Sequence, residues 1–120
     1  MWKGYEYIMN INERKLNDVT VLDLEGSFIL GENGQFKQRV AADIEGGGRR
    51  LIVNLAKVGY MDSSGLGELI SGYIAMQRVS GHIKLLHLND RLNNLLVVTK
   101  LITVFETFES ESAAISSFAC

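Results

Sequence analysis

The sequence predicts a single small α/β domain in which strands alternate with helices. Short runs of aliphatic and β-branched residues are typical of strands, and longer segments carry apolar residues at helical spacing. Glycine, serine and asparagine separate the two kinds of segment. This alternation within 120 residues implies a mixed, mostly parallel four- to five-stranded sheet with about four helices packed on it.

The first half of the chain contains two expected strands and a helix. Val19 to Glu25 is rich in β-branched and aliphatic residues and stops at Gly26, and Met9 to Lys15 is expected to pair with it. Apolar and small side chains recur at helical spacing from Gln35 to Ile44. The glycines at 46–48 are expected to end that helix, because glycine readily adopts the left-handed conformation found at helix ends.

A buried strand and the longest helix follow. Leu51 to Leu55 is a nearly unbroken apolar run, which is typical of a central parallel strand covered on both faces. The next helix is expected from about residue 64 to Ser80, with one apolar stripe facing the core. The residues of this stripe are Leu66, Leu69, Ile70, Tyr73 and Ile74.

The last third repeats the alternation. Ile83 to Leu88 and Val104 to Phe108 are expected strands. A short helix carrying Leu92, Leu95 and Leu96 is expected between them, capped by Asn89 or Asp90. A terminal helix is expected to be capped by Ser110 and to turn Ala114, Ile115 and Phe118 inward.

Composition excludes several classes of function. The formal net charge of −2 provides no basic surface for nucleic acid, and the single cysteine, Cys120, cannot form an internal disulfide. No apolar run approaches the roughly 20 residues of a membrane helix, so we expect a cytoplasmic protein without membrane insertion, cofactor or metal. Residues 1–8 are expected to be a disordered or extra N-terminal extension of a domain spanning 1–120.

The segment from Tyr60 to Gly67 lies between the central strand and the longest helix, where ligands and partners bind in open α/β sheets. Asp62, Ser63 and Ser64 are all good helix caps, so capping alone could explain them. However, one cap suffices for a helix, and glycines at 65 and 67 each cost about 1 kcal/mol of helix stability relative to alanine. Two hydroxyls beside exposed backbone are accessible to the active site of a protein kinase, so this segment is suited to be a kinase substrate.

A phosphate on either serine would add about −1.5 to −2 charge at a helix N-terminus, where the helix dipole favours it. Asp62 would repel it and concentrate negative charge at one spot. A helical wheel at about 100° per residue predicts a partner-contact stripe beside the buried face. Its residues are Gly65, Glu68, Gly72, Met76 and Val79. Met76 and Val79 could equally be the edge of the core.

Two segments around the serine pair resemble those of a known protein family. Val53-Asn54-Leu55 followed by the segment Tyr60 to Gly67 resembles the anti-sigma factor antagonists of the STAS superfamily. The resemblance extends over nearly the whole chain and implies a single STAS-like domain. It also implies that the unphosphorylated protein binds an anti-sigma factor with serine kinase activity and so frees a sigma factor. A metal-dependent serine phosphatase would remove the phosphate.

The resemblance also implies roles for particular residues. It assigns phosphorylation to Ser64, with Ser63 as the alternative. The protein would be a monomer or weak dimer and would not be an enzyme. Together with the predicted stripe, the expected partner-binding residues are Asp62, Ser63, Ser64, Gly65, Leu66, Gly67, Glu68, Gly72 and Met76.

Two other functions remain alternatives. Related domains act as scaffolds or subunits of stress-sensing or lipid-transport complexes. A serine-nucleophile enzyme would need a base close to the serine, but His82 and His87 are the only histidines and are expected on opposite faces of one strand. The segment around Ser64 also lacks the G-x-S-x-G pattern of a nucleophile elbow.

Overall fold

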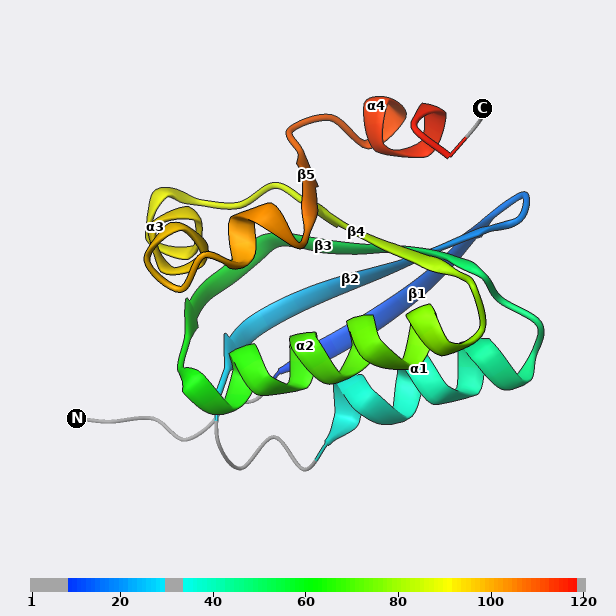
Figure 1. Cartoon of the computed structure of the whole chain (residues 1–120), viewed down its shortest axis with the longest axis horizontal. Coiled ribbons are helices and arrows are strands. Elements are labelled where there is room, and N and C mark those ends of the chain that lie inside the picture. Colours follow the sequence, from blue (N-terminus) through cyan, green and yellow to red (C-terminus); the bar gives the residue numbers. More distant parts are fainter. Residues whose placement is uncertain (1–8, 30–33, 119–120) are drawn as a thin grey trace.

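The computed structural model describes residues 9–29 and 34–118, so the expected extension at residues 1–8 lies outside the described residues. Within these ranges the chain forms one five-stranded sheet and four α-helices (Figure 1). The elements are β1 (Asn10–Leu16), β2 (Val19–Phe28), α1 (Gln35–Glu45), β3 (Arg50–Met61), α2 (Ser63–Arg78), β4 (His82–Leu86), α3 (Asp90–Val98), the 3-10 helix η2 (Leu101–Thr103), β5 (Glu106–Phe108) and α4 (Glu111–Ser116).

The strands lie in the order β1-β2-β3-β4-β5. β1 and β2 form an antiparallel hairpin that pairs Leu16 with Val19, and Asn17 takes the left-handed conformation that the tight turn needs. The other neighbours are parallel. The predicted fold class, a mixed and mostly parallel sheet with about four helices, is therefore confirmed.

Two strands are longer than the sequence predicts. β2 continues past Gly26 to Phe28, and β3 continues past Leu55 to Met61. The two strands stay paired across two register shifts, and Gly26 has φ 117° beside one of them. A glycine inside a strand often marks such an irregularity. Gly26 therefore accompanies a register shift within β2 and does not end the strand.

Two other strands are shorter than predicted. β4 ends at Leu86 because His87 takes a left-handed conformation with φ 60°. β5 contains only Glu106–Phe108, because the preceding residues form η2 and then turn Phe105 into the core. The helices and their caps agree with expectation, except that Ile74, predicted to face the core, is 45% exposed. Asn89 accepts from the amide of Leu92 at 2.8 Å, and Ser110 accepts from that of Ala113 at 3.3 Å.

Helices α1 and α2 lie side by side on one face of the sheet, and α4 packs on the other (Figure 1). Successive side chains of each strand point to opposite faces of the sheet, so each strand contributes to the apolar layers on both faces. On β2, Leu22 and Leu24 join the core beneath α1 and α2, whereas Val19 and Val21 join the smaller cluster beneath α4. Because α1 and α2 both follow parallel strands, they begin at the same end of the molecule.

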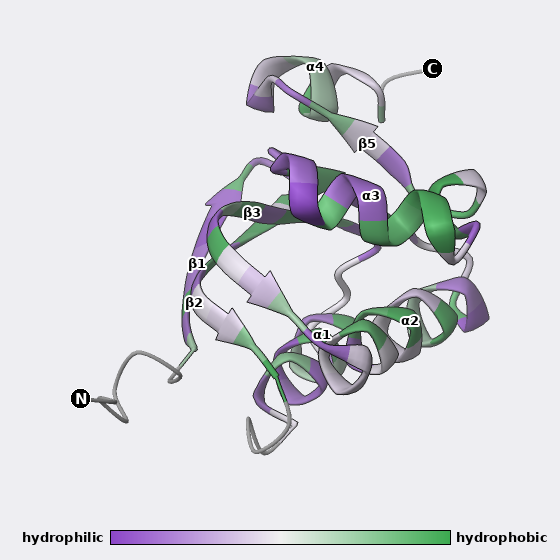
Figure 2. Cartoon of the chain, turned by 90° about the vertical axis from the view of Figure 1, so that its left-hand side faces the viewer, coloured by the Kyte–Doolittle hydropathy of each residue, from purple (hydrophilic) through white to green (hydrophobic). Residues whose placement is uncertain are grey.

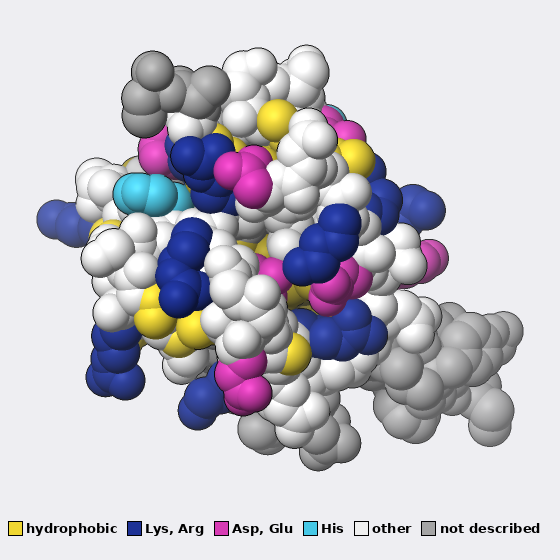
Figure 3. All heavy atoms as spheres, turned by 90° about the vertical axis from the view of Figure 1, so that its right-hand side faces the viewer, with side chains coloured by type: hydrophobic (Ala, Val, Ile, Leu, Met, Phe, Trp, Pro, Cys, Tyr) yellow, Lys and Arg dark blue, Asp and Glu magenta, His cyan; other side chains and the backbone are white. Residues whose placement is uncertain are grey.

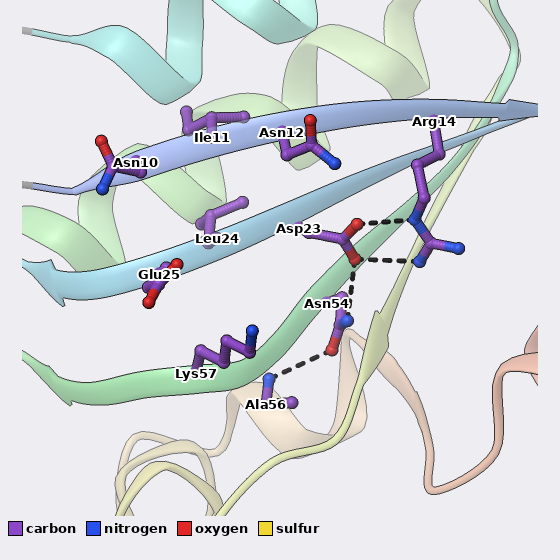
Figure 4. Close-up of a pocket in the computed structure, with 10 residues that line it drawn as sticks. All are labelled: Asn10, Ile11, Asn12, Arg14, Asp23, Leu24, Glu25, Asn54, Ala56 and Lys57. Carbon is purple, nitrogen blue, oxygen red and sulfur yellow. Dashed lines mark hydrogen bonds and ion pairs between the residues drawn. The ribbon is translucent and has the colours of Figure 1, made fainter.

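The part of the second sheet face that α4 leaves open is polar. Here Arg14 lies between two carboxylates: it donates to Asp23 at 2.6 and 2.9 Å (Figure 4) and to Glu111 at 2.6 and 3.3 Å. Asn54 also donates to Asp23, at 2.8 Å. This bonded cluster of Arg14, Asp23 and Asn54 lines part of the groove of about 460 Å³ on this face. Arg14 ties the start of α4 to β1 and β2.

Acid should weaken this cluster. Hydrogen bonds from Arg14, and then from Asn54, lower the pKa of Asp23 below its usual value. A carboxyl whose folded pKa is lowered contributes stability above its unfolded pKa of about 3.9, and this contribution is lost as pH falls through the folded value. We expect Asp23→Asn to be less stable than the parent at pH 7, with a smaller difference at pH 3, in urea unfolding.

Asp18→Asn is the matched control for this prediction. Asp18 pairs with Arg50 at 2.7 Å, but its side chain is 68% exposed, so its loss should change the unfolding free energy by less than about 1 kcal/mol. An Asp23→Asn difference of equal size at both pH values would contradict the proposed role of the Arg14–Asp23 pair.

Candidate functional site

The residues from Tyr60 onward form the junction between β3 and α2. Asp62 is extended and its carboxylate accepts from the amide of Gly65 at 2.9 Å, so Asp62 is the N-cap and α2 begins at Ser63. Of the three candidate caps, only Asp62 therefore has this role. Capping does not account for the two serines, which occupy the first two positions of the helix.

Both hydroxyls are available for chemistry. Ser63 is exposed and Ser64 is half-buried, and neither side chain hydrogen-bonds to another described residue. Their backbone amides belong to the first turn of a 16-residue helix, where amides have no partner within the helix. An anionic group attached to either serine would lie in the favourable field of this helix end.

The two glycines of the turn have different environments. Gly65 lies directly against the backbone carbonyl of Phe28, which also accepts from the amide of Asp62 at 3.3 Å. A side chain at Gly65 would collide with that carbonyl, whereas nothing lies within 4 Å of the Cβ position of Gly67. Close packing against β2 therefore explains Gly65, and only Gly67 exposes backbone beside the serines.

Most residues of the predicted partner-contact stripe along α2 are buried in the structure. Gly65, Gly72 and Met76 are buried, and Met76 has no exposed surface. Gly72 is covered by α1, whose Phe36 and Val40 side chains lie against it. Leu66, also expected to bind a partner, is buried at 8% exposure. Of the predicted stripe, only Glu68 and Val79 retain partial exposure.

Sequence reasoning did not select Tyr60, which is 46% exposed at the end of β3. The guanidinium of Arg91, on α3, lies 6.0 Å from the centre of its ring. Asn89, the α3 cap, also donates to the carbonyl of Val58 at 3.1 Å. Figure 2 views this end of the molecule, where α3 lies beside β3. An aromatic side chain two residues before Asp62 was the available signal.

The opposite end of the molecule, viewed in Figure 3, carries mixed charges. Arg50 is paired with Asp18 at 2.7 Å, and Lys15 with Asp43 at 3.0 Å. Cationic side chains paired with carboxylates in this way do not form a continuous basic surface.

The histidines are not arranged as the sequence predicted. His82 begins β4, whereas His87 follows it, so the two do not share one strand. His82 lies at the end of the sheet away from the serines, because β3 and β4 are parallel and α2 starts where β3 ends. Neither histidine hydrogen-bonds to a serine among the described residues. Neither histidine is therefore held as a hydrogen-bonded base beside Ser63 or Ser64 in the described part of the chain.

The described part of the chain contains neither a cluster of metal ligands nor a membrane-crossing helix. No cluster there brings together three or more histidine, cysteine, aspartate or glutamate residues that could hold a metal ion. Within the same ranges, none of the helices combines the length and the apolar composition needed to cross a bilayer.

Residues 10–114 match the STAS domain family, so the chain belongs to this family. The chain is 22% identical over 110 residues to BtrV of Bordetella bronchiseptica, a protein named as an anti-sigma factor antagonist. That alignment covers 92% of this chain and 95% of BtrV.

Solved structures share the fold. TM1081 of Thermotoga maritima superposes with a TM-score of 0.84 at 19% identity, covering 89% of this chain and 92% of that one. The phosphorylated form of the Bacillus cell fate determinant SpoIIAA gives 0.72 at 20% identity, covering 91% and 99%. The murine anion transporter Slc26a9 also gives 0.72 at 17% identity, covering 85% of this chain and 18% of the transporter. These similarities establish the fold, and the function has to be argued from the residues of the site.

Proposed function

We propose that this protein is an anti-sigma factor antagonist that works by switching partners in the cytoplasm. Unphosphorylated, it binds an anti-sigma factor with serine kinase activity and thereby releases a sigma factor. Phosphorylation of Ser64, with Ser63 as the alternative, prevents this binding, and a metal-dependent serine phosphatase restores it. The protein acts as a binding partner and substrate, not as an enzyme, and is a monomer or weak dimer.

The observation that carries this proposal is the serine pair in the first turn of α2. Asp62 already caps the helix, and neither serine hydroxyl is bonded to a described residue. BtrV and SpoIIAA are both named as anti-sigma factor antagonists, and SpoIIAA has been solved in unphosphorylated and phosphorylated forms, which supports the same function. The family resemblance favours Ser64, whereas the greater exposure of Ser63 makes it the alternative that an experiment must separate.

The mechanism is an electrostatic change on a surface that keeps its shape. A phosphate adds about −1.5 to −2 charge beside Asp62, on a helix end whose dipole and free amides tolerate it. A partner docked on the serines would then face a concentrated negative charge that replaces neutral hydroxyls. Juxtaposed like charges cost several kcal/mol across an interface, which is enough to release a bound protein.

The partner surface proposed here is smaller than the predicted set. Asp62, Ser63, Ser64, Gly67 and Glu68 remain as contact residues, because each keeps at least partial exposure. The buried members of the predicted set instead support the surface from below, by packing α2 against α1 and β2.

Phosphate transfer tests the proposal. Mixed with its cognate anti-sigma factor kinase and ATP, the protein should gain one phosphate in its intact mass. Ser64→Ala should abolish this gain and Ser63→Ala should retain it. Labelling that persists in Ser64→Ala and disappears in Ser63→Ala would move the site to Ser63. A stable complex whose protein is never phosphorylated would refute the switch and favour the scaffold alternative.

A further inference from the structure

Helix α1 obtains its N-terminal cap from a different helix. Its own N-cap residue, Gly34, has φ 69° and no side chain, and its first turn contains no acidic residue. Instead, a carboxylate oxygen of Glu68 on α2 accepts from the backbone amide of Lys37 at 3.2 Å. The other carboxylate oxygen lies 3.8 Å from the Cβ position of Gly34. The Glu68 carboxylate thus supplies the negative charge that a helix N-terminus favours.

Glu68 also lies one helical turn after Ser64. Residues four apart on a helix are neighbours, with Cβ atoms about 5–6 Å apart, so Ser64 and Glu68 share a face of α2. Ser63 is five positions away, which rotates it by about 140° from Glu68 at about 100° per residue. Of the two serines, only Ser64 is therefore a neighbour of the carboxylate that caps α1.

We propose that Glu68 is a positioning residue that couples a negative charge on Ser64 to the first turn of α1. The charge repels the Glu68 carboxylate across one helical turn and weakens its hydrogen bond to the Lys37 amide. The start of α1 then loses its only external cap among the described contacts. Modification of Ser64 thus alters two neighbouring helix starts, whereas modification of Ser63 alters one.

This inference rests on the proposed function in one respect only: the negative charge on Ser64 is taken to be a phosphate. The coupling itself belongs to the isolated domain, so aspartate can stand in for phosphoserine and no kinase is needed. Failure of the coupling therefore refutes this inference alone, and failure of phosphate transfer refutes the proposed function alone.

Nuclear magnetic resonance of the full chain tests the coupling at the Lys37 amide. Ser64→Asp should shift this resonance and speed its hydrogen exchange about 2- to 10-fold, which corresponds to a typical net hydrogen-bond contribution of about 0.5–1.5 kcal/mol. Ser63→Asp, which adds the same charge one residue away, should leave the resonance and its exchange rate unchanged. This comparison uses the native Glu68 and so does not depend on whether a Glu68 variant folds.

A second pair of variants separates coupling from a merely structural role. Glu68→Gln keeps an oxygen that can accept from Lys37 but removes the charge. In this background Ser64→Asp should no longer change the exchange of the Lys37 amide. Equal effects of Ser63→Asp and Ser64→Asp, or an effect of Ser64→Asp that persists undiminished in Glu68→Gln, would overturn the inference.

Discussion

Replacing Gly65 with alanine is expected to destabilise the domain by about 3 kcal/mol, the upper part of the range for overpacking a tightly packed site. The added methyl group would collide with the carbonyl oxygen of Phe28. That carbonyl cannot easily move, because Phe28 is paired with Met61 in the sheet and also accepts from the amide of Asp62. Urea unfolding followed by circular dichroism measures the change.

Gly67→Ala is the matched control, because it makes the same substitution two residues later in the same helix. Nothing lies within 4 Å of the Cβ position of Gly67, so alanine should stabilise the domain by about 0.5–1 kcal/mol through its better helix propensity. The two variants should therefore change the unfolding free energy in opposite directions. A stabilising effect of Gly65→Ala would show that the close packing of α2 on β2 is misassigned.

Ser64→Asp should keep the fold but weaken binding to the anti-sigma factor about 100-fold. An acidic residue in the first turn of α2 interacts favourably with the helix dipole, which offsets the weakened bond between Glu68 and Lys37, so the net change in the free energy of unfolding should stay below about 1 kcal/mol. The cost arises in the interface, where like charges opposed across a contact cost several kcal/mol and each 1.4 kcal/mol is about tenfold in affinity. Titration calorimetry measures the affinity, and circular dichroism checks the fold.

Ser112→Asp controls for the added charge. Ser112 occupies the second position of α4, as Ser64 does in α2, and it is exposed on the opposite face of the sheet. This variant should bind the anti-sigma factor with the parent affinity. If Ser112→Asp weakened binding as much as Ser64→Asp, net charge and not the site would explain the loss. An unfolded Ser64→Asp protein would contradict the mechanism.

Local patterns predicted most of the fold. The helix carrying Leu66 and Leu69 and the buried strand beginning at Leu51 were found because their periodicity depends only on nearby residues. Strand ends were predicted less well. β2 and β3 extend beyond their apolar runs because each supplies the other's hydrogen bonds, which a single segment does not reveal.

The candidate site was found from the sequence, but its surroundings were not. A helical wheel orders the faces of α2, yet it does not say that Phe36 of α1 covers Gly72. The reason for Gly65 likewise lies in β2, far along the chain. The bond from Lys37 to Glu68 spans 31 residues. Contacts between distant segments leave no periodic signal in the sequence. Helix propensities therefore showed that the glycines weaken the start of α2, but they did not show which distant segment requires them.

The most direct test of the partner switch follows release of the sigma factor. The complex of the cognate anti-sigma factor with its sigma factor would be titrated with this protein, either unmodified or phosphorylated on the α2 serine, in the absence of ATP. Separation by size exclusion then measures free sigma factor. We predict release by the unmodified protein and none by the phosphorylated protein at the same concentration. Equal release by both forms, or by neither, would contradict the account.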